Sequence, residues 1–223
     1  MRRNEWTALG VLAAAFLGGA ALASGSSEQL PWFVSRAAGV GAFLTLTASM
    51  ILGLLVTTKA AEPRVPRAFS FEIHSFLSVL SLTLVGVHGG ALLFDSWFHF
   101  TPLHLLVPFM APYAPIWTGL GVIAAWTMAI VTGSFWMKKR IGYRAWRKLH
   151  FASFAAYVLS LGHGVSAGTD TTNPLVAAMY VCSAAAVFGL LTVRIAKRKP
   201  RSGSAPSGAR GVGAGARRMA PER

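Results

Sequence analysis

Six long stretches of this chain contain no Asp, Glu, Lys or Arg: residues 6–27, 37–58, 73–94, 96–137, 149–169 and 171–193. A bilayer crossing takes about 20 mostly apolar residues, so every stretch is long enough to be a membrane span. Only 13% of the residues are charged, against about 25% in a typical soluble domain. The sequence therefore predicts an all-α fold, a polytopic membrane helical bundle, and argues against a soluble enzyme.

We expect six transmembrane helices, at about residues 5–23, 32–56, 69–94, 112–136, 145–166 and 173–195. The fourth uncharged stretch is long enough for two crossings. Its first part contains four prolines between residues 102 and 115, and proline interrupts a regular helix. We therefore expect that part to be an external loop, with at most a short interfacial segment. Asn173 followed by Pro174 is typical of a helix start.

The basic residues predict the orientation of these helices. With six spans the two termini share one side, and that side receives every Lys and Arg except Arg36. The opposite side receives Glu28, Asp95 and Asp170. Cytoplasmic loops carry the excess of Lys and Arg, so both termini are predicted to be cytoplasmic. The net charge of +14 is then a topology signal rather than evidence for a nucleic acid partner.

The two ends of the chain need separate interpretations. Residues 1–199 are expected to form one transmembrane domain, and residues 200–223, rich in Gly, Ser, Pro and Arg, a disordered basic cytoplasmic tail. The first helix is interpreted as an uncleaved span. Its pattern also fits a cleavable signal peptide, whose removal would leave five spans with the same orientation. The single cysteine, Cys182, excludes an intrachain disulfide and a Cys-based metal cluster.

Four of the six histidines fall inside predicted spans, where ionisable side chains are costly and mark functional sites by default. His74 and His88 lie in the third helix, and His150 and His163 in the fifth. Both helices run from the cytoplasm outward, so the spacings of 14 and 13 residues place the histidines at two levels ~20 Å apart. Imidazole is a good axial ligand for haem iron. Two stacked bis-histidine haems would satisfy all four residues.

One feature of the spacing does not fit a straight helix. At about 100° per residue, 14 residues return close to the same face, but 13 residues miss it by about 140°. A local distortion near Gly162-His163-Gly164, or different haem orientations, would reconcile the two spacings. Glycines beside His88 and His163 would let a flat macrocycle approach the backbone, although they are also common in membrane helices as packing residues.

Other polar residues are candidates with an equally good structural interpretation. Arg67, Arg144, Arg147 and Lys148 could meet haem propionates near the inner histidines, or reflect topology alone. In the external loop, His99 and His104 could bind a metal ion or an acceptor, but aromatic neighbours make them more typical of a membrane interface. A proton relay or transporter would also use buried histidine, yet only Glu72 lies near a span.

The sequence resembles the ferric reductase-like transmembrane domain family over about residues 32–170. The matching segments are Phe71-Glu-Ile-His74-Ser-Phe-Leu-Ser78, Val87-His88-Gly89, Tyr143-Arg-Ala-Trp-Arg-Lys-Leu-His150 and His163-Gly164. The family includes the membrane parts of ferric reductases and NADPH oxidases, and the haem-binding subunit of the bacterial methionine sulfoxide reductase system. Segments 108–115 and 166–170 look like its bacterial, stand-alone branch, which implies a multi-pass protein of a bacterial-type inner membrane.

The resemblance implies two b-type haems, with His74 and His150 as ligands of the inner haem and His88 and His163 as ligands of the outer one. It also implies electron transfer outward to an external or periplasmic acceptor. Full-length reductases of the family carry a flavin and nicotinamide module, which this chain lacks. Electrons would then come from a separate protein, a flavin or a quinol, and ferric iron is not assigned as substrate. The alternatives are an anchor subunit of a periplasmic oxidoreductase and a non-enzymatic membrane protein or transporter with structural histidines.

Overall fold

The computed structural model describes residues 29–58 and 66–197, and these residues form helices and connecting loops without any strand. The helices are α2 (Leu30–Thr58), α3 (Arg67–Leu92), α4 (Pro102–Leu106), α5 (Pro115–Ile141), α6 (Tyr143–His150), α7 (Ala152–Ala167) and α8 (Pro174–Ala196). The predicted helix at 5–23 and the predicted tail at 200–223 lie outside the described residues. The all-α prediction is confirmed for the part that is described.

Four helices are long and apolar enough to cross a membrane: α2, α3, α5 and α8. They correspond to the predicted second, third, fourth and sixth spans, with ends shifted by a few residues. The predicted loop before α5 contains only the five-residue helix α4 among irregular segments. A second crossing in this region is therefore absent from the described residues, as the prolines predicted.

The predicted fifth span is not one regular helix. It consists of α6 and α7, separated by Phe151. Two hydrogen bonds of the i→i−3 type flank the joint, from the Phe151 N–H to the Lys148 carbonyl and from the Phe154 N–H to the Phe151 carbonyl, both 3.1 Å. This is the geometry of a 3₁₀ turn. The 16 residues of α7 alone are too few for a full crossing.

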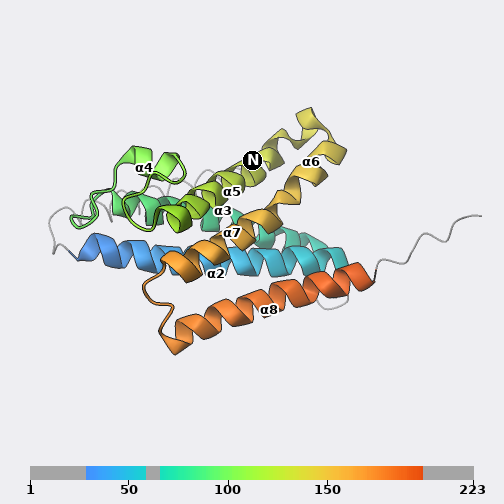
Figure 1. Ribbon diagram of the computed structural model, residues 1–223. Coiled ribbons are helices and arrows are strands. Elements are labelled where there is room, and N and C mark those ends of the chain that lie inside the picture. The colour runs from blue at the N-terminus through green and yellow to red at the C-terminus, as the bar shows by residue number, and fades with distance from the viewer. Residues whose placement is uncertain (1–28, 59–65, 198–223) are drawn as a thin grey trace, which may run out of the picture.

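Helix α2 lies at the centre of the bundle (Figure 1). It packs along its length against α3, and also contacts α7 and α8, while α5 packs against α7. The buried core is formed by α2, α7 and α8, with Met128 from α5. Phe43 of α2 contacts both Tyr157 and Tyr180, at ring-centroid distances of 5.7 and 5.0 Å. This arrangement makes α2 the element on which the others are positioned.

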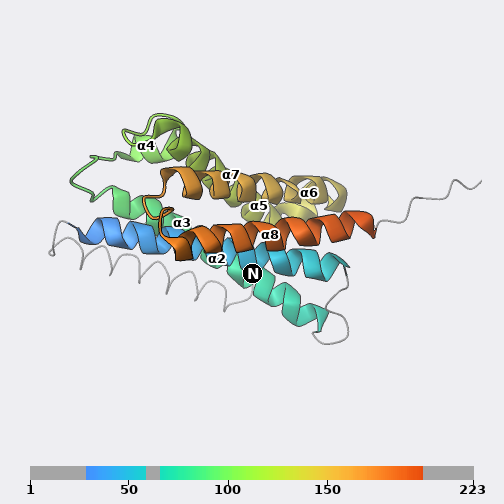
Figure 2. The ribbon, with the colours of Figure 1, turned by 60° about the horizontal axis from the view of Figure 1, so that its bottom comes forward.

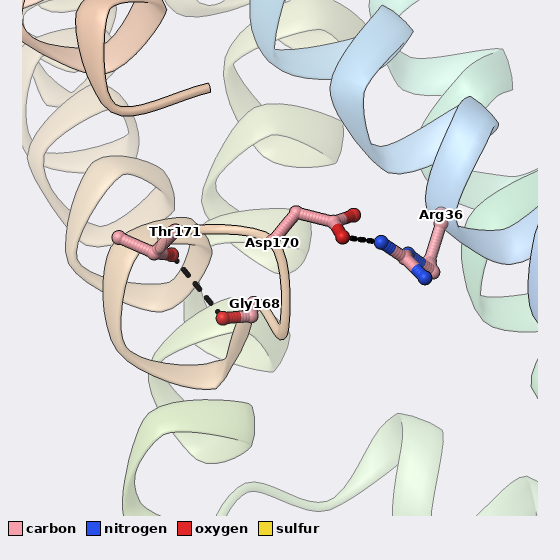
Figure 3. A network of polar contacts seen from close by, with 4 residues as sticks. All are labelled: Arg36, Gly168, Asp170 and Thr171. Atoms are coloured by element: carbon pink, nitrogen blue, oxygen red, sulfur yellow. Dashed lines mark hydrogen bonds and ion pairs between the residues drawn. The ribbon is translucent and has the colours of Figure 1, made fainter. Parts of the chain in front are cut away.

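The two ends of the bundle differ in charge. In both views α4 lies at one end, and α6 lies at the other, where α8 also ends (Figures 1 and 2). The end with α6 carries all the described Lys and Arg residues except Arg36. Arg36 forms an ion pair with Asp170 of the α7–α8 loop (Figure 3), and its guanidinium lies 3.9 Å from the Trp32 ring centroid.

Helix ends follow from local chemistry. Gly142 joins α5 to α6 with φ of 81°, a left-handed conformation that glycine adopts without steric cost. Asn173 caps α8 as its sequence predicted, since its side-chain oxygen accepts a hydrogen bond of 2.9 Å from the Leu175 N–H. Pro174 then occupies the first turn, where its missing N–H costs nothing.

Replacing the cap residue should weaken the start of α8. We expect Asn173→Ala to lower the free energy of unfolding by about 1 kcal/mol, because the Leu175 N–H loses its acceptor. Asn173→Ser should retain most of this free energy of unfolding, because the serine hydroxyl can also accept the hydrogen bond. Thermal unfolding in detergent micelles measures the effect, with Thr172→Ala as the matched exposed control. Equal losses in the Asn173→Ala and Thr172→Ala variants would contradict the assignment.

Candidate functional site

The four histidines of the predicted spans meet in two pairs. His74 of α3 lies against His150 of α6, with ring centroids 6.1 Å apart and ring planes at 71°. His88 of α3 lies against His163 of α7, at 6.0 Å and 75°. The pairs are the ones expected from the sequence, and α3 therefore runs parallel to α6 and α7. Because His74 and His88 are 14 positions apart on α3, the two levels are ~20 Å apart.

The irregular joint at Phe151 supplies part of the rotation by which a spacing of 13 residues falls short of a full number of turns. Each residue in a 3₁₀ turn advances by about 120° rather than about 100°. Three such residues add about 60° of the roughly 140° that a straight helix would miss, and they turn His150 toward the face of His163. Helix α7 continues unbroken through Gly162 and Gly164, so the distortion expected at these glycines is at Phe151 instead.

Three of the four rings are held by a backbone carbonyl. Nδ1 of His74 lies 2.9 Å from the Ser49 carbonyl oxygen, and Nδ1 of His88 lies 2.8 Å from that of Ser35. Nδ1 of His163 lies 2.9 Å from the Trp117 carbonyl oxygen. A carbonyl only accepts hydrogen bonds, so Nδ1 carries the proton in each ring. The lone pair is then on Nε2, the nitrogen left available to a metal.

A glycine stands four residues after each of these carbonyls. A helical carbonyl lies beside the side chain one turn later, so a Cβ there would obstruct an approaching ring. A Cβ at Gly39 would lie 2.9 Å from His88 Nδ1, and one at Gly121 would lie 2.7 Å from His163 Nδ1. At Gly53 the contact with His74 would be 3.4 Å. The glycines therefore admit the histidine rings to the helix backbone.

These supporting residues were missed in the sequence, although a signal for them is present. The motif Ser-x-x-x-Gly occurs twice in α2, at Ser35 and at Ser49, 14 residues apart. His74 and His88 have the same spacing. Both spacings equal about four helical turns. On two antiparallel helices they would have predicted that Ser35 pairs with His88 and Ser49 with His74.

The serine hydroxyls extend the support of the α3 histidines. Ser49 Oγ lies 3.0 Å from His74 Nδ1 and 2.8 Å from Ser78 Oγ, and the Ser78 hydroxyl donates to the His74 carbonyl at 2.8 Å. At the outer level, the Ser35 hydroxyl lies 3.1 Å from His88 Nδ1 and donates to the His88 carbonyl at 3.0 Å. Both rings are thus fixed by side-chain and backbone groups of α2.

His150 has a different environment. Its ring makes no hydrogen bond within residues 29–58 and 66–197, and it stacks instead on Trp146, with centroids 5.2 Å apart and planes at 27°. Tyr143 follows one turn further, 5.7 Å from Trp146, and is exposed. The Lys138 ammonium lies 5.6 Å from the Trp146 ring centroid. A short ladder of rings therefore connects His150 to the basic end of the bundle.

The other residues expected near the histidines have mixed outcomes. Arg144, Arg147 and Lys148 are exposed on α6, and Arg147 lies 5.9 Å from the Tyr143 ring centroid. Of Arg67 only the backbone is described, at the start of α3.

The glycines beside the outer histidines also divide into two groups. No described atom comes within 4 Å of a Cβ at Gly86 or Gly162, so both glycines face open space. Gly164 instead serves packing, because a Cβ there would lie 2.6 Å from the Tyr180 hydroxyl.

The loop histidines belong to local structure. The Thr101 N–H donates to Nδ1 of His104 at 3.2 Å, which closes the first turn of α4, and His99 is exposed with φ of 51°. Asp95 is buried, and its Oδ2 accepts a hydrogen bond from the Phe98 N–H at 2.9 Å. These contacts favour the structural interpretation of the loop residues.

The comparisons with known proteins give no independent evidence about this site. Neither the protein-family models nor the curated proteins nor the solved structures include a match to this chain. Among the described residues, no group of three or more His, Cys, Asp or Glu side chains could hold a metal ion. Each level offers two imidazoles, so further donors would have to come from the bound group itself.

Filling the space beside the Trp117 carbonyl should disrupt the outer pair. In Gly121→Ala the new Cβ would collide with the His163 ring and break its hydrogen bond, and losing such a support typically costs 10–100-fold in metal affinity. If each level holds one haem, as the resemblance implies, the haem content per chain should fall from two toward one. Gly133→Ala on the same helix, where a Cβ meets no described atom, is the matched control. Retention of both haems in Gly121→Ala would contradict this role of the glycine.

Proposed function

We propose that this protein is a di-haem b-type membrane cytochrome, resembling the ferric reductase-like family, which carries electrons across the membrane. His74 and His150 would hold the inner haem, and His88 and His163 the outer haem. When bound, haem iron alternates between its ferric and ferrous states and so accepts and releases single electrons.

The observation that carries the proposal is the spacing of the histidine pairs. A bond between a metal ion and an imidazole nitrogen is about 2.0–2.1 Å long, so two rings on opposite sides of one ion have centroids about 6 Å apart. The pairs have centroid distances of 6.1 and 6.0 Å. Two independent pairs with this spacing, one per level, are difficult to attribute to packing alone.

The backbone around the pairs also fits a large flat group. Helix α3 packs extensively on α2, whereas its backbone makes few close approaches to α6 or α7, and the histidine rings bridge α3 to these two helices. Trp146 Nε1, on the ring stacked against His150, is buried without a hydrogen-bond partner among the described residues. A buried unpaired donor is costly, and the carboxylates of a haem are acceptors for which it is suited.

The chain's own residues provide orientation and a dry interior. The carbonyls of Ser35, Ser49 and Trp117 fix the tautomer and direction of three rings. Between the two levels, the buried side chains of Phe43 and Tyr157 belong to the apolar core. Water is excluded there, so charge moving between the levels meets a low-dielectric medium.

Electron entry is proposed at the basic, cytoplasmic end. Stacked Trp146 and exposed Tyr143 lead from this surface to His150, which supports entry at the inner level and exit at the outer one. The donor would be a separate protein, a flavin or a quinol, and the acceptor a separate molecule outside. Membrane lipids surround the bundle, and six spans with both termini cytoplasmic accommodate this direction.

A purified sample should show the spectrum of a reducible b-type cytochrome. We expect close to two haems per chain, with absorbance changes on addition of dithionite. His88→Ala should remove the outer haem and spare the inner one, because the inner level has its own ligands.

A folded protein without bound haem would contradict the proposed function. His104→Ala, which removes a histidine outside both pairs, should keep both haems and serves as the control. Loss of neither haem in His88→Ala would refute the pairing even if haem is present.

The orientation can be tested by labelling cysteines with a membrane-impermeant maleimide. In a Cys182→Ala background, Thr172→Cys should be labelled in right-side-out spheroplasts, because the α7–α8 loop is proposed to face outward. Lys139→Cys should be labelled only after permeabilisation. The reverse pattern would show that the basic end faces outward and that the proposed direction of transfer is wrong.

A further inference from the structure

The histidine pairs differ in how firmly their members are held. His74, His88 and His163 each donate Nδ1–H to a carbonyl at 2.8–2.9 Å. The ring of His150 has no hydrogen-bond partner among the described residues and contacts the rings of Trp146 and His74 instead. An outer-shell hydrogen bond typically contributes 10–100-fold to metal affinity. His150 is therefore the weakest of the four ligands.

The backbone beneath His150 is also the least constrained. His150 is the last residue of α6, an eight-residue helix without any buried residue. The 3₁₀ turn at Phe151 separates it from α7, and α6 packs mainly on α5. By contrast, His163 is internal to α7 and lies against the Gly121 backbone. Small movements of α6 can therefore withdraw His150 without disturbing the other three rings.

We propose that the inner level is a binding site for a diatomic gas, opened by release of His150 from ferrous haem iron. The inference rests on the proposed function, since it requires haem at the inner level. The ligand class is a small neutral diatomic such as carbon monoxide or nitric oxide. His74, whose Nδ1–H is held by the Ser49 carbonyl, would remain as the inner ligand.

The outer level should not bind the gas under the same conditions. Both of its rings are held by carbonyl hydrogen bonds, and the glycines at 39 and 121 place these rings against helix backbones. The Arg36–Asp170 ion pair further ties α2, which supports His88, to the loop that follows α7. Release of either ring would break its hydrogen bond to a backbone carbonyl, and an imidazole N–H left without an acceptor is costly.

Carbon monoxide binding to the dithionite-reduced, two-haem protein tests the proposal. We expect one CO per chain in an optical titration, with a rate that saturates at high CO because release of His150 becomes limiting. His88→Ala, which retains only the inner haem, should still bind one CO, and His163→Ala serves the same purpose if His88→Ala does not fold.

Each outcome distinguishes this site from the proposed function. Two bound haems with no CO, or with two CO molecules, would overturn the inference and leave the cytochrome intact. Loss of CO binding in both His88→Ala and His163→Ala would place the gas at the outer level and also overturn it. Absence of haem in the wild-type protein would overturn both proposals together.

Discussion

Hydrogen bonds between α3 histidines and α2 carbonyls organise this bundle. An imidazole N–H inside an apolar helix bundle requires an acceptor, and the available ones are carbonyl oxygens already engaged in helices. A carbonyl oxygen has two lone pairs, so it can accept a second hydrogen bond if nothing blocks the approach. Gly39, Gly53 and Gly121 remove the obstruction. The extensive α2–α3 packing and the parallel course of α3 and α7 are arranged around these contacts.

Much of the architecture could be predicted because a helix that spans a membrane requires a long apolar stretch of sequence. The prediction included four helices that are long and apolar enough to span a membrane and the irregular loop with its prolines. It also included the level-by-level meeting of the histidines. The predicted fifth helix is interrupted at Phe151 and was wrong in being continuous. A hydropathy pattern does not reveal a 3₁₀ turn such as this one. Whether the first apolar run is a span falls outside the described residues.

The support of the site was harder to predict than its histidines. Ser35, Ser49 and Trp117 act through backbone carbonyls, which every residue type possesses, so their identities carry little information. The glycines appeared significant only beside His88 and His163, yet those that touch the rings are Gly39 and Gly121 on other helices. A carbonyl becomes informative only when the partner helix and its register are known. Trp146, which stacks on His150, could likewise not be distinguished in the sequence from other aromatic residues at a membrane interface.

The repeated Ser-x-x-x-Gly motif in α2 has a consequence for how this chain can vary. Side chains that face lipid can change widely, because only their apolar character matters there. The length of α2 between Ser35 and Gly53 has no such freedom. One inserted or deleted residue would rotate one motif by about 100° relative to the other, and a histidine of α3 would lose its carbonyl. Helix α2 therefore fixes the spacing of the two supporting carbonyls. Its lipid-facing positions tolerate substitution, but its length does not tolerate insertion or deletion.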